Sequence, residues 1–404
     1  MLLLVALAGC GGESAGSPAA PTGPVGTGPS GSSGSDAGGG GAAAGSTAAA
    51  TGSGGGSAGA AVGYPIPDWP TGAPEDHGFD PSKLAAAAAV AESEQSYCLL
   101  VIRHGVIVDE HYWNGTDATT KSPSWSIAKS YTSALVGIAL DRGEIQSLDQ
   151  SVADYVPEWK GTDREAITIR HLLSMMSGLT WSVFQDYVSM ATFAPDHTQF
   201  AVGLSLADPP GSKWIYHNGG VQILEPVIRA ATGHTLEEYA EEHLWPLLGM
   251  TASWKHDPAG NDTAYANVLA SCRDHARFGY LYLHGGLWET EQVISAAHVA
   301  GTITPSQTMN RAYGWLWWLN AGTPAMDAMM EAWPGLMVPF APKDLFAARG
   351  FGNQFIDVIP SLDLMVVRFG PDPMTSFDLA QMAADSRFEQ HDAILKPVLD
   401  AIVE

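Results

Sequence analysis

Runs of aliphatic, β-branched and aromatic residues occur near both ends of the part of this chain that can fold, and helical patterns fill the stretch between them. Residues 97–103 and 106–112 form the first pair of runs, and residues 354–359 and 364–369 form the second. Each pair, joined by a short turn, predicts a β-hairpin. A sheet divided between the two ends of a sequence, with helices inserted between, predicts an α+β fold: an antiparallel sheet flanked by helices, with an inserted, mainly helical subdomain.

Apolar residues recur every three or four positions in several segments, which is the spacing of one buried helix face. The pattern that begins at Ser126 runs to Asp141 and stops at Gly143. The segments that predict helices are residues 81–90, 126–141, 169–176, 221–231, 236–244, 273–283 and 388–403. Most of them fall between residues 148 and 287, where we expect the helical subdomain.

Residues 11–63 consist almost wholly of Gly, Ser, Ala, Pro and Thr, with no aromatic residue and only Glu13 and Asp36 charged. Such a segment cannot bury enough apolar area to offset its ordering entropy, so we expect a flexible tether followed by one globular domain at 64–404. Two G-x-S-x-G matches, at residues 12–16 and 55–59, lie inside this segment. A nucleophile elbow needs a strand before it and a helix after it, so both matches are compositional.

Residues 1–10 form an apolar run that closes on small residues, which is typical of a secretory signal peptide rather than a membrane span. The tetrad Leu-Ala-Gly-Cys at residues 7–10 resembles the bacterial lipobox, in which cleavage leaves the cysteine as a lipidated N-terminus. We therefore expect Cys10 to be lipidated and the protein to be an exported bacterial lipoprotein, periplasmic or at the cell surface. An uncleaved or simply secreted N-terminus is the alternative.

The chain is strongly acidic, with 43 acidic against 19 basic side chains and a net charge of −24. This charge repels nucleic acid and anionic lipid headgroups, so we expect no nucleic-acid partner and membrane association only through a lipid anchor. Besides Cys10 there are two cysteines, Cys98 and Cys272. They pair in an oxidising compartment if the fold brings them within reach; otherwise they are two isolated buried thiols.

Lys129 is the only lysine of the chain with a serine three residues before it. Three residues are nearly one helical turn, so Ser126 and Lys129 share a helix face within side-chain reach. A buried lysine has its pKa lowered and can take the serine proton, while the helix N-terminus offers free N–H groups to an oxyanion. A solvated lysine is the bland alternative, but the neighbours Trp125, Ile127, Ala128 and Leu135 are apolar. We expect Ser126 to be the nucleophile and Lys129 its base.

A second polar element lies at residues 216–218, Tyr-His-Asn. In an extended segment Tyr216 and Asn218 point to one side and His217 to the other. The phenol could then relay a proton to the leaving group, and the amide could hold the substrate carbonyl and orient Lys129. A core tyrosine followed by a turn-forming asparagine is the alternative.

Three motifs, in this order, resemble the serine β-lactamase and penicillin-binding-protein-like superfamily. They are S-x-x-K at residues 126–129, H-L-L-S-M-M-S-G-L at residues 171–179 and Y-x-N at residues 216–218. The resemblance covers nearly the whole segment from about residue 80 to residue 404 and is closest to the esterase and 6-aminohexanoate-oligomer hydrolase branch, near class C β-lactamases. It implies the β-lactamase/transpeptidase-like fold, with Ser126 acylated, Lys129 as base, Tyr216 as proton relay and Asn218 as substrate ligand.

The superfamily's third motif, K-T-G, has its best counterpart in Ala348-Arg349-Gly350, where alanine stands in place of the lysine. That lysine binds the carboxylate of a β-lactam or peptide terminus, so its absence disfavours those substrates, unless Arg349 supplies a substitute charge. Gly350 would let the substrate lie close to the strand, and the N–H of Phe351 would be the second oxyanion donor.

Aromatic residues gather where the superfamily builds its acyl pocket, at Trp181, Tyr187 and residues 313–318. Tyr187 stands near the place where amide-hydrolysing relatives hold a substrate-contacting tyrosine; for most of the others core packing is the better interpretation. The sequence has no H-E-x-x-H, and His234 with Glu237 or His243 is typical of a polar helix surface, so we expect no metal and no cofactor.

The sequence thus predicts a serine hydrolase that cleaves a small-molecule carboxylic ester or amide through an acyl-enzyme on Ser126. A β-lactamase or D-alanyl-D-alanine carboxypeptidase is the alternative within the same chemistry. A catalytically inactive module that binds cell wall or polymer is the alternative from another class. The natural substrate, the preference for ester or amide and the oligomeric state are not encoded in recognisable motifs.

Overall fold

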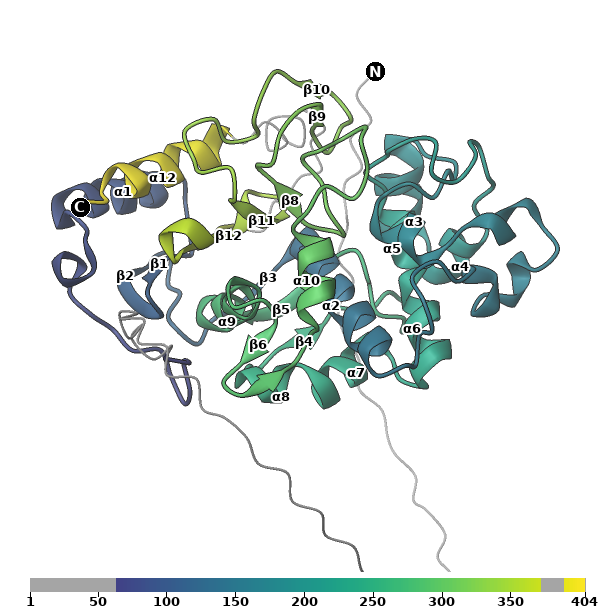
Figure 1. The fold of residues 1–404 in the computed structure, drawn as a ribbon, viewed down its shortest axis with the longest axis horizontal. Helices are drawn as coiled ribbons and strands as arrows, with labels where there is room; N and C mark the ends of the chain where they lie inside the picture. Colours follow the sequence, from purple (N-terminus) through teal and green to yellow (C-terminus); the bar gives the residue numbers. More distant parts are fainter. Residues whose placement is uncertain (1–62, 372–388, 404) are drawn as a thin grey trace, which may run out of the picture. The chain divides into compact units, whose positions relative to one another are not determined.

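The structure is a computed structural model that describes residues 63–371 and 389–403. A six-stranded antiparallel sheet in the order β2-β1-β13-β12-β11-β8 is its central layer (Figure 1). Its strands are β1 (Cys98–Arg103), β2 (Val106–Tyr112), β8 (Trp318–Leu319), β11 (Phe346–Gly350), β12 (Gln354–Ile359) and β13 (Leu364–Phe369). Because β1 pairs with β13, the two predicted hairpins meet in the middle of one sheet. The predicted α+β class with an antiparallel sheet is confirmed.

Every predicted helix has a counterpart in the structure, but the predicted helix 169–176 ends at Leu173, shortly before Met175 with its φ of +59°. The helices at residues 197–202, 245–248 and 296–302 and the π-helix were not predicted. The helices are α1 (Pro81–Ser93), α2 (Ala128–Asp141), α3 (Ile169–Leu173), α4 (His197–Val202), α5 (Asn218–Gln222), α6 (Leu224–Thr232), α7 (Leu236–His243), α8 (Trp245–Leu248), α9 (Cys272–Leu283), α10 (Ala296–Thr302), α12 (Glu389–Asp400) and the π-helix Phe184–Phe193. The predicted helix 221–231 is divided at Ile223, because Pro226 has no amide hydrogen for the carbonyl of Gln222. The predicted helix at Ser126 begins two residues later, at Ala128, after a 3-10 turn.

Within the described residues, seven shorter strands form three small sheets outside the central sheet. These strands are β3 (Lys121–Pro123), β4 (Ser253–Trp254), β5 (Val268–Ser271), β6 (Leu287–Trp288), β7 (Glu291–Gln292), β9 (Ala325–Met326) and β10 (Ala332–Trp333). The strands β3, β5 and β4 form a small three-stranded sheet. It pairs residues 121–123, just before Ser126, with residues 269–271, which follow Tyr265 and Asn267 in the chain.

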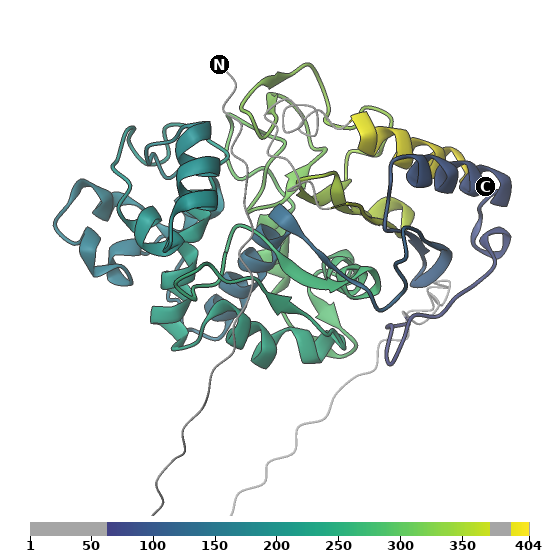
Figure 2. The ribbon, with the colours of Figure 1, turned by 180° about the vertical axis from the view of Figure 1, so that it is seen from behind.

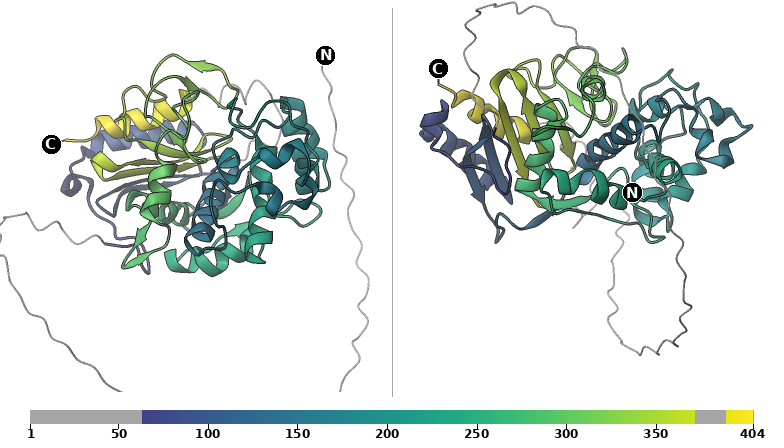
Figure 3. Two further views of the ribbon diagram at one scale, coloured as in Figure 1. Left: turned by 45° about the vertical axis from the view of Figure 1, so that its right-hand side comes forward. Right: turned by 60° about the horizontal axis from the view of Figure 1, so that its bottom comes forward.

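Helices cover both faces of the central sheet. From behind, α1 and α12 lie side by side, although they come from opposite ends of the chain (Figure 2). Figure 3 shows these two helices on one face of the sheet, with α9 on the other. On β12 the side chains alternate accordingly: Phe355 contacts His391 of α12, with ring centroids 4.8 Å apart, whereas Ile356 packs against Gly279 of α9, where a Cβ atom would lie 2.6 Å away.

A disulfide joins Cys98 of β1 to Cys272 at the start of α9, which settles the question that the sequence left open. It fastens the sheet to the helix that covers it. No helix within residues 63–371 and 389–403 is long and apolar enough to cross a membrane. The predicted signal peptide, lipidated Cys10 and residues 11–62 of the tether lie outside the described residues, as does the first residue of the helix predicted at 388–403.

Candidate active site

Ser126 lies in the 3-10 turn Trp125–Ile127 that leads into α2. Trp125 has φ of +50°, a left-handed conformation that few non-glycine residues adopt. Two hydrogen bonds hold it there: its N–H donates to Asn267 Oδ1 (3.2 Å), and the N–H of Asn267 donates back to its carbonyl (3.0 Å). This strained turn fixes the position of the Ser126 hydroxyl on the wall of a cavity.

Lys129 is buried, with 1% of its surface exposed, one turn along from Ser126. Its ammonium nitrogen donates to Ser126 Oγ (2.8 Å) and to the carbonyl of Tyr265 (2.9 Å), and it lies 4.9 Å from the ring centroid of Tyr216. Burial lowers the pKa of Lys129 to about 7, although the negative charge of Asp186 opposes the shift. This shift favours the uncharged amine, which is the form of a lysine that can accept a proton.

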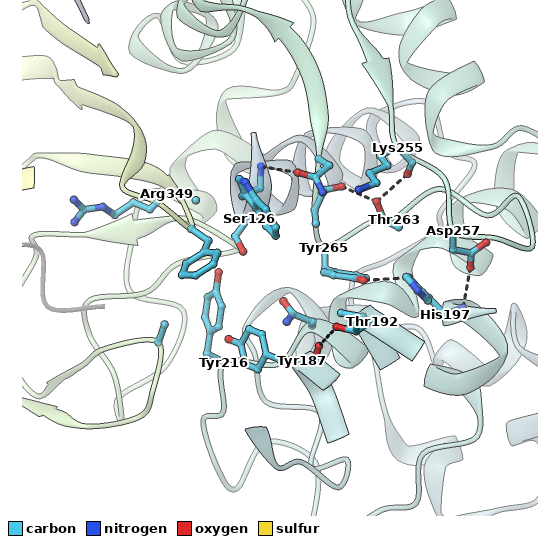
Figure 4. A pocket seen from close by; sticks show the side chains of 18 of the residues that line it. Ser126, Tyr187, Thr192, His197, Tyr216, Lys255, Asp257, Thr263, Tyr265 and Arg349 are labelled. Carbon is cyan, nitrogen blue, oxygen red and sulfur yellow. Dashed lines mark hydrogen bonds between the residues drawn. The ribbon is translucent and has the colours of Figure 1, made fainter. Parts of the chain in front are cut away.

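Tyr216 completes this cluster. Figure 4 shows its phenol oxygen directed toward Ser126. Burial raises the pKa of Tyr216, and a hydrogen bond with Ser126 opposes the shift, so the phenol keeps its proton at neutral pH. The ring stacks on Trp318, with centroids 5.5 Å apart, and meets Tyr313 edge on at 6.0 Å. These aromatic contacts fix the orientation of the phenol relative to Ser126.

The stretch at residues 171–179 supports the Tyr216 segment from behind. The N–H of Ile215 donates to the carbonyl of Met175 (3.0 Å), and the N–H of His217 donates to its sulfur (3.4 Å). Gly178 has φ of +75°, and a Cβ atom there would lie 2.1 Å from the carbonyl oxygen of Asp208. The recognisable pattern of this stretch therefore reflects a backbone platform rather than side chains that reach the cavity.

Asn218 is the first residue of α5, and Tyr187 lies in the π-helix Phe184–Phe193. A hydrogen bond joins the two side chains, and both line the cavity. The buried carboxylate of Asp186 binds the two segments together, because it accepts the N–H of Asn218 (3.0 Å) and the N–H of Gly219 (2.9 Å). His217 turns aside, as the alternation predicted, with its Nε2 3.5 Å from Asp186.

The end of β11 forms the opposite wall. A Cβ atom on Gly350 would lie 2.4 Å from the carbonyl oxygen of Ser124, so only glycine lets the strand approach the turn that holds Ser126. Phe351 follows, with its ring edge on to Trp125 at 5.5 Å. Gly350 and Phe351 thus lie against the turn that holds Ser126 and line the same cavity.

The substitute charge considered for Arg349 is not directed at Ser126, although Arg349 is one of the residues that line the cavity. Its guanidinium points away from Ser126 (Figure 4). Arg349 pairs with Phe355 across the sheet, so the pleat sends both side chains to the α12 face. Burial there lowers the pKa of Arg349 to about 10 against the attraction of Asp357 and Asp392. Ala348, in the position of the motif lysine, is buried.

These residues surround a cavity of about 480 Å³. Its aromatic lining consists of Trp125, Tyr187, Tyr216, Tyr265, Trp318 and Phe351. Of the aromatic residues that the sequence offered for the acyl pocket, only Tyr187 and Trp318 line it. Tyr313 and Trp317 are buried in the core, as the packing interpretation expected.

Sequence reasoning missed several residues at this site. Tyr265 contributes a backbone carbonyl to Lys129, and a carbonyl leaves no signature in a sequence. Asp186 was detectable only as the neighbour of Tyr187. Lys255, an exposed cation from the other side of the cavity, lies on an irregular connection that carries no motif.

Comparisons with known proteins agree with this geometry. The family model described as Beta-lactamase matches residues 85–371. A 6-aminohexanoate-dimer hydrolase of Paenarthrobacter ureafaciens is 24% identical over 222 residues, which are 50% of this chain and 56% of the relative. A D-aminopeptidase of Brucella anthropi is 29% identical over 191 residues, which are 43% of this chain and 35% of the relative. The matched regions thus span about half or less of these two relatives.

Among solved structures, a Bacillus anthracis protein named after 6-aminohexanoate-dimer hydrolase superposes with a TM-score of 0.64. It is 19% identical, and the superposition covers 83% of this chain and 88% of that one. At this identity the likeness concerns the fold, and it extends over nearly the whole described domain.

Proposed function

Because this chain belongs to the beta-lactamase family, we propose that it hydrolyses carboxylic esters or amides through an acyl-enzyme on Ser126. The observation that carries the proposal is the 2.8 Å contact between Ser126 Oγ and a buried lysine whose pKa is lowered to about 7. A hydroxyl becomes a useful nucleophile only when a neighbour removes its proton, and Lys129 meets the requirements of distance and pKa together.

In the first half-reaction, neutral Lys129 accepts the hydroxyl proton while Ser126 Oγ attacks the substrate carbonyl carbon. The oxyanion that forms is stabilised by the N–H groups of Ser126 and Phe351. The phenol of Tyr216 passes a proton to the departing alkoxide or amine and is reprotonated from Lys129. In the second half-reaction, water attacks the acyl carbon, the same groups accept its proton, and Ser126 recovers its hydroxyl as the acid leaves.

The cavity favours substrates with an uncharged acyl group. Six aromatic rings line it, and β11 directs no cation at Ser126. An alkoxide departs more readily than an amine, so esters come first. Secondary amides remain within the proposal, because a hydrogen bond couples Tyr187 and Asn218 beside the nucleophile.

One observation favours the β-lactamase or carboxypeptidase alternative. The cavity is lined on another side by Lys255, an exposed cation that could pair with a substrate carboxylate. The alternative therefore requires that Lys255, rather than a residue of β11, recognise the negative charge.

A substrate panel separates these functions. Turnover of p-nitrophenyl acetate, p-nitrophenyl butyrate, 6-aminohexanoate dimer and nitrocefin would be measured with the wild type and with Lys255→Gln. We expect fast ester turnover that Lys255→Gln leaves unchanged and slow turnover of nitrocefin. Fast nitrocefin hydrolysis with inert esters, together with a raised KM for nitrocefin in Lys255→Gln, would establish the alternative instead.

A fluorophosphonate probe tests whether the protein is instead an inactive binding module. Intact-mass spectrometry after treatment should show one covalent adduct, and peptide mapping should place it on Ser126. Ser126→Ala is the control and should remain unmodified. A wild-type protein that stays unmodified under conditions that label a known serine hydrolase would contradict the enzyme proposal.

Export with a lipid anchor on Cys10 is a further part of the proposal. The disulfide between Cys98 and Cys272 supports it, because such bonds persist mainly in oxidising compartments. Metabolic labelling of the full chain with a palmitate analogue should mark the wild type and not Cys10→Ser. Equal labelling of both proteins, or of neither, would count against the anchor.

A further inference from the structure

Three side chains that can bind metal ions converge beside the cavity, outside the proposed catalytic cluster. Glu237 lies in the first turn of α7. His256 and Asp262 face each other across an isolated antiparallel bridge, in the connection that follows β4. One ligand atom from each of the three lies within 4.8 Å of the other two.

In these contacts one imidazole nitrogen, Nε2 of His256, faces two carboxylate oxygens. His256 Nε2 lies 2.9 Å from Glu237 Oε2 and 2.8 Å from Asp262 Oδ1. An imidazole nitrogen carries at most one hydrogen, and here its direction suits Glu237. Within the described part of the chain, Asp262 Oδ1 is buried and makes no hydrogen bond. A proton on His256 therefore cannot satisfy both carboxylates, whereas a cation among the three atoms would contact all of them.

Backbone groups orient the two carboxylates toward this point. The N–H of Trp254 donates to Glu237 Oε1 (3.1 Å), and the N–H of Glu237 donates to Asp262 Oδ2 (2.8 Å). Each carboxylate thus has one oxygen engaged by the backbone and the other directed at His256. Such supporting hydrogen bonds are typical of metal sites, where they fix the ligands in place before the ion arrives.

Burial makes this arrangement costly without a cation. The side chain of Asp262 is only 1% exposed, and a carboxylate charge buried this far requires a compensating positive charge. The side chain of His256 is 47% exposed, so the cluster opens to solvent on one side. An ion could enter from that side and keep water as its remaining ligand.

We infer that Glu237, His256 and Asp262 form a binding site for a divalent transition-metal ion, with Zn²⁺ as the best fit. Zn²⁺ takes imidazole nitrogen and carboxylate oxygen, and three protein ligands with one water complete its tetrahedral shell. Two carboxylates and a neutral imidazole also balance its charge. The earlier expectation of no metal paired Glu237 with His234, but the fold pairs it with His256 instead.

The site has a structural consequence for the cavity. The proposed ligand His256 lines the cavity wall together with its neighbours Lys255 and Asp257, as does Thr263 next to Asp262. A bound metal ion would link the connection that carries His256 and Asp262 to α7, which carries Glu237. The site takes part in no step of the proposed hydrolysis, so it can be tested without an activity assay.

The full chain, freed of any polyhistidine tag and treated with a chelator, would be titrated with ZnCl₂ by calorimetry at pH 7.5. We expect one equivalent to bind and the Tm to rise. His256→Ala and Asp262→Asn should weaken binding at least about tenfold. His234→Ala is the matched control, because its imidazole is similarly exposed and lies 3.5 Å from the single carboxylate of Glu242; it should bind Zn²⁺ like the wild type.

X-ray absorption at the zinc edge of the 1:1 complex supplies an independent test that needs no variant. The spectrum should contain one imidazole with oxygen ligands. Binding of no equivalent, equal affinity in wild type and Asp262→Asn, or a spectrum with two or more imidazoles would each overturn the inference.

Discussion

Two cations are buried to the same extent in this domain, yet their surroundings use them differently. Lys129 and Arg368 are each 1% exposed. Lys129 has two hydrogen-bond acceptors, Ser126 Oγ and the carbonyl of Tyr265. Arg368 on β13 donates to Ser96 Oγ and to three carbonyls, those of Glu94, Gly352 and Asn353.

The difference follows from what each group can do with its proton. A guanidinium stays charged in proteins, so its burial requires a full set of acceptors. A buried amine with few acceptors instead releases its proton, which is what a base must do. Burial therefore favours a neutral amine at Lys129, whereas at Arg368 it favours a charged group held by its acceptors. We call the contacts of Arg368 with Ser96 and the three carbonyls the Arg368 clamp.

The clamp also bears on the site. Gly352 and Asn353, whose carbonyls bind Arg368, form the turn between β11 and β12, directly after Phe351. We therefore assign Arg368 as a positioning residue for the proposed oxyanion donor.

The largest expected effect is the loss of the base. Lys129→Ala should lower kcat/KM by at least about 10³-fold, and Lys129→Arg should do the same because it keeps the charge but cannot accept a proton. Ester hydrolysis would be measured, with circular dichroism to check folding. Lys213→Ala, an exposed lysine beside Asp208, is the control and should be fully active. Normal turnover in Lys129→Arg would mean that the base is another group.

The pH dependence should report the lowered pKa of Lys129. The amine is active when neutral, so kcat/KM should fall about tenfold per pH unit below about 7 and reach a plateau above it. Initial rates with a neutral ester between pH 5 and pH 9 give the profile. A profile without an acid limb, or a midpoint near the ordinary lysine value, would show that burial does not tune this group.

Removing the contacts of Arg368 should lower the stability of the domain more than the rate of hydrolysis. Arg368→Met removes the donor to three carbonyls and to the buried Ser96 Oγ, and we expect the free energy of unfolding to fall by about 3 kcal/mol and kcat/KM by about tenfold. The acid limb should keep its midpoint, because Lys129 is unchanged. Urea unfolding and pH–rate profiles measure both effects.

Arg103→Met is the matched control for that variant. Arg103 donates to the carbonyls of His77 and Gly78, so it also holds a turn, but far along the chain from the residues of the site. It should lose stability without losing kcat/KM per folded molecule. Equal losses of activity in both variants would remove the special role of Arg368.

The sequence predicted the sheet and the Ser126–Lys129 pair, but not the residues that surround and support this pair. Three of its four predicted strand ranges match β2, β12 and β13 residue for residue, and the fourth differs from β1 by one residue. The S-x-x-K pair needed only the helical period. Arg368 looked like an ordinary strand residue, since its role depends on carbonyls at residues 94 and 352, which are distant in sequence. The conformation of Trp125 and the carbonyl of Tyr265 likewise depend on tertiary contacts that no local pattern records.

The smallest expected effect concerns Asp186, whose negative charge acts on the pKa of Lys129. The carboxylate of Asp186 raises the pKa of Lys129 against the effect of burial. Asp186→Asn removes that charge while its amide oxygen can still accept an N–H from Asn218 or Gly219. The acid limb of kcat/KM should therefore move to lower pH, by less than about one unit.

The sign of that shift separates electrostatics from loss of structure. Asp149→Asn removes a carboxylate that pairs with Arg170 on the surface, and its acid limb should stay in place. If Asp186 only held Asn218 in position, Asp186→Asn would lower the plateau and leave the midpoint unmoved. A midpoint that moved to higher pH would contradict the view that the acceptors around a buried amine set its strength as a base.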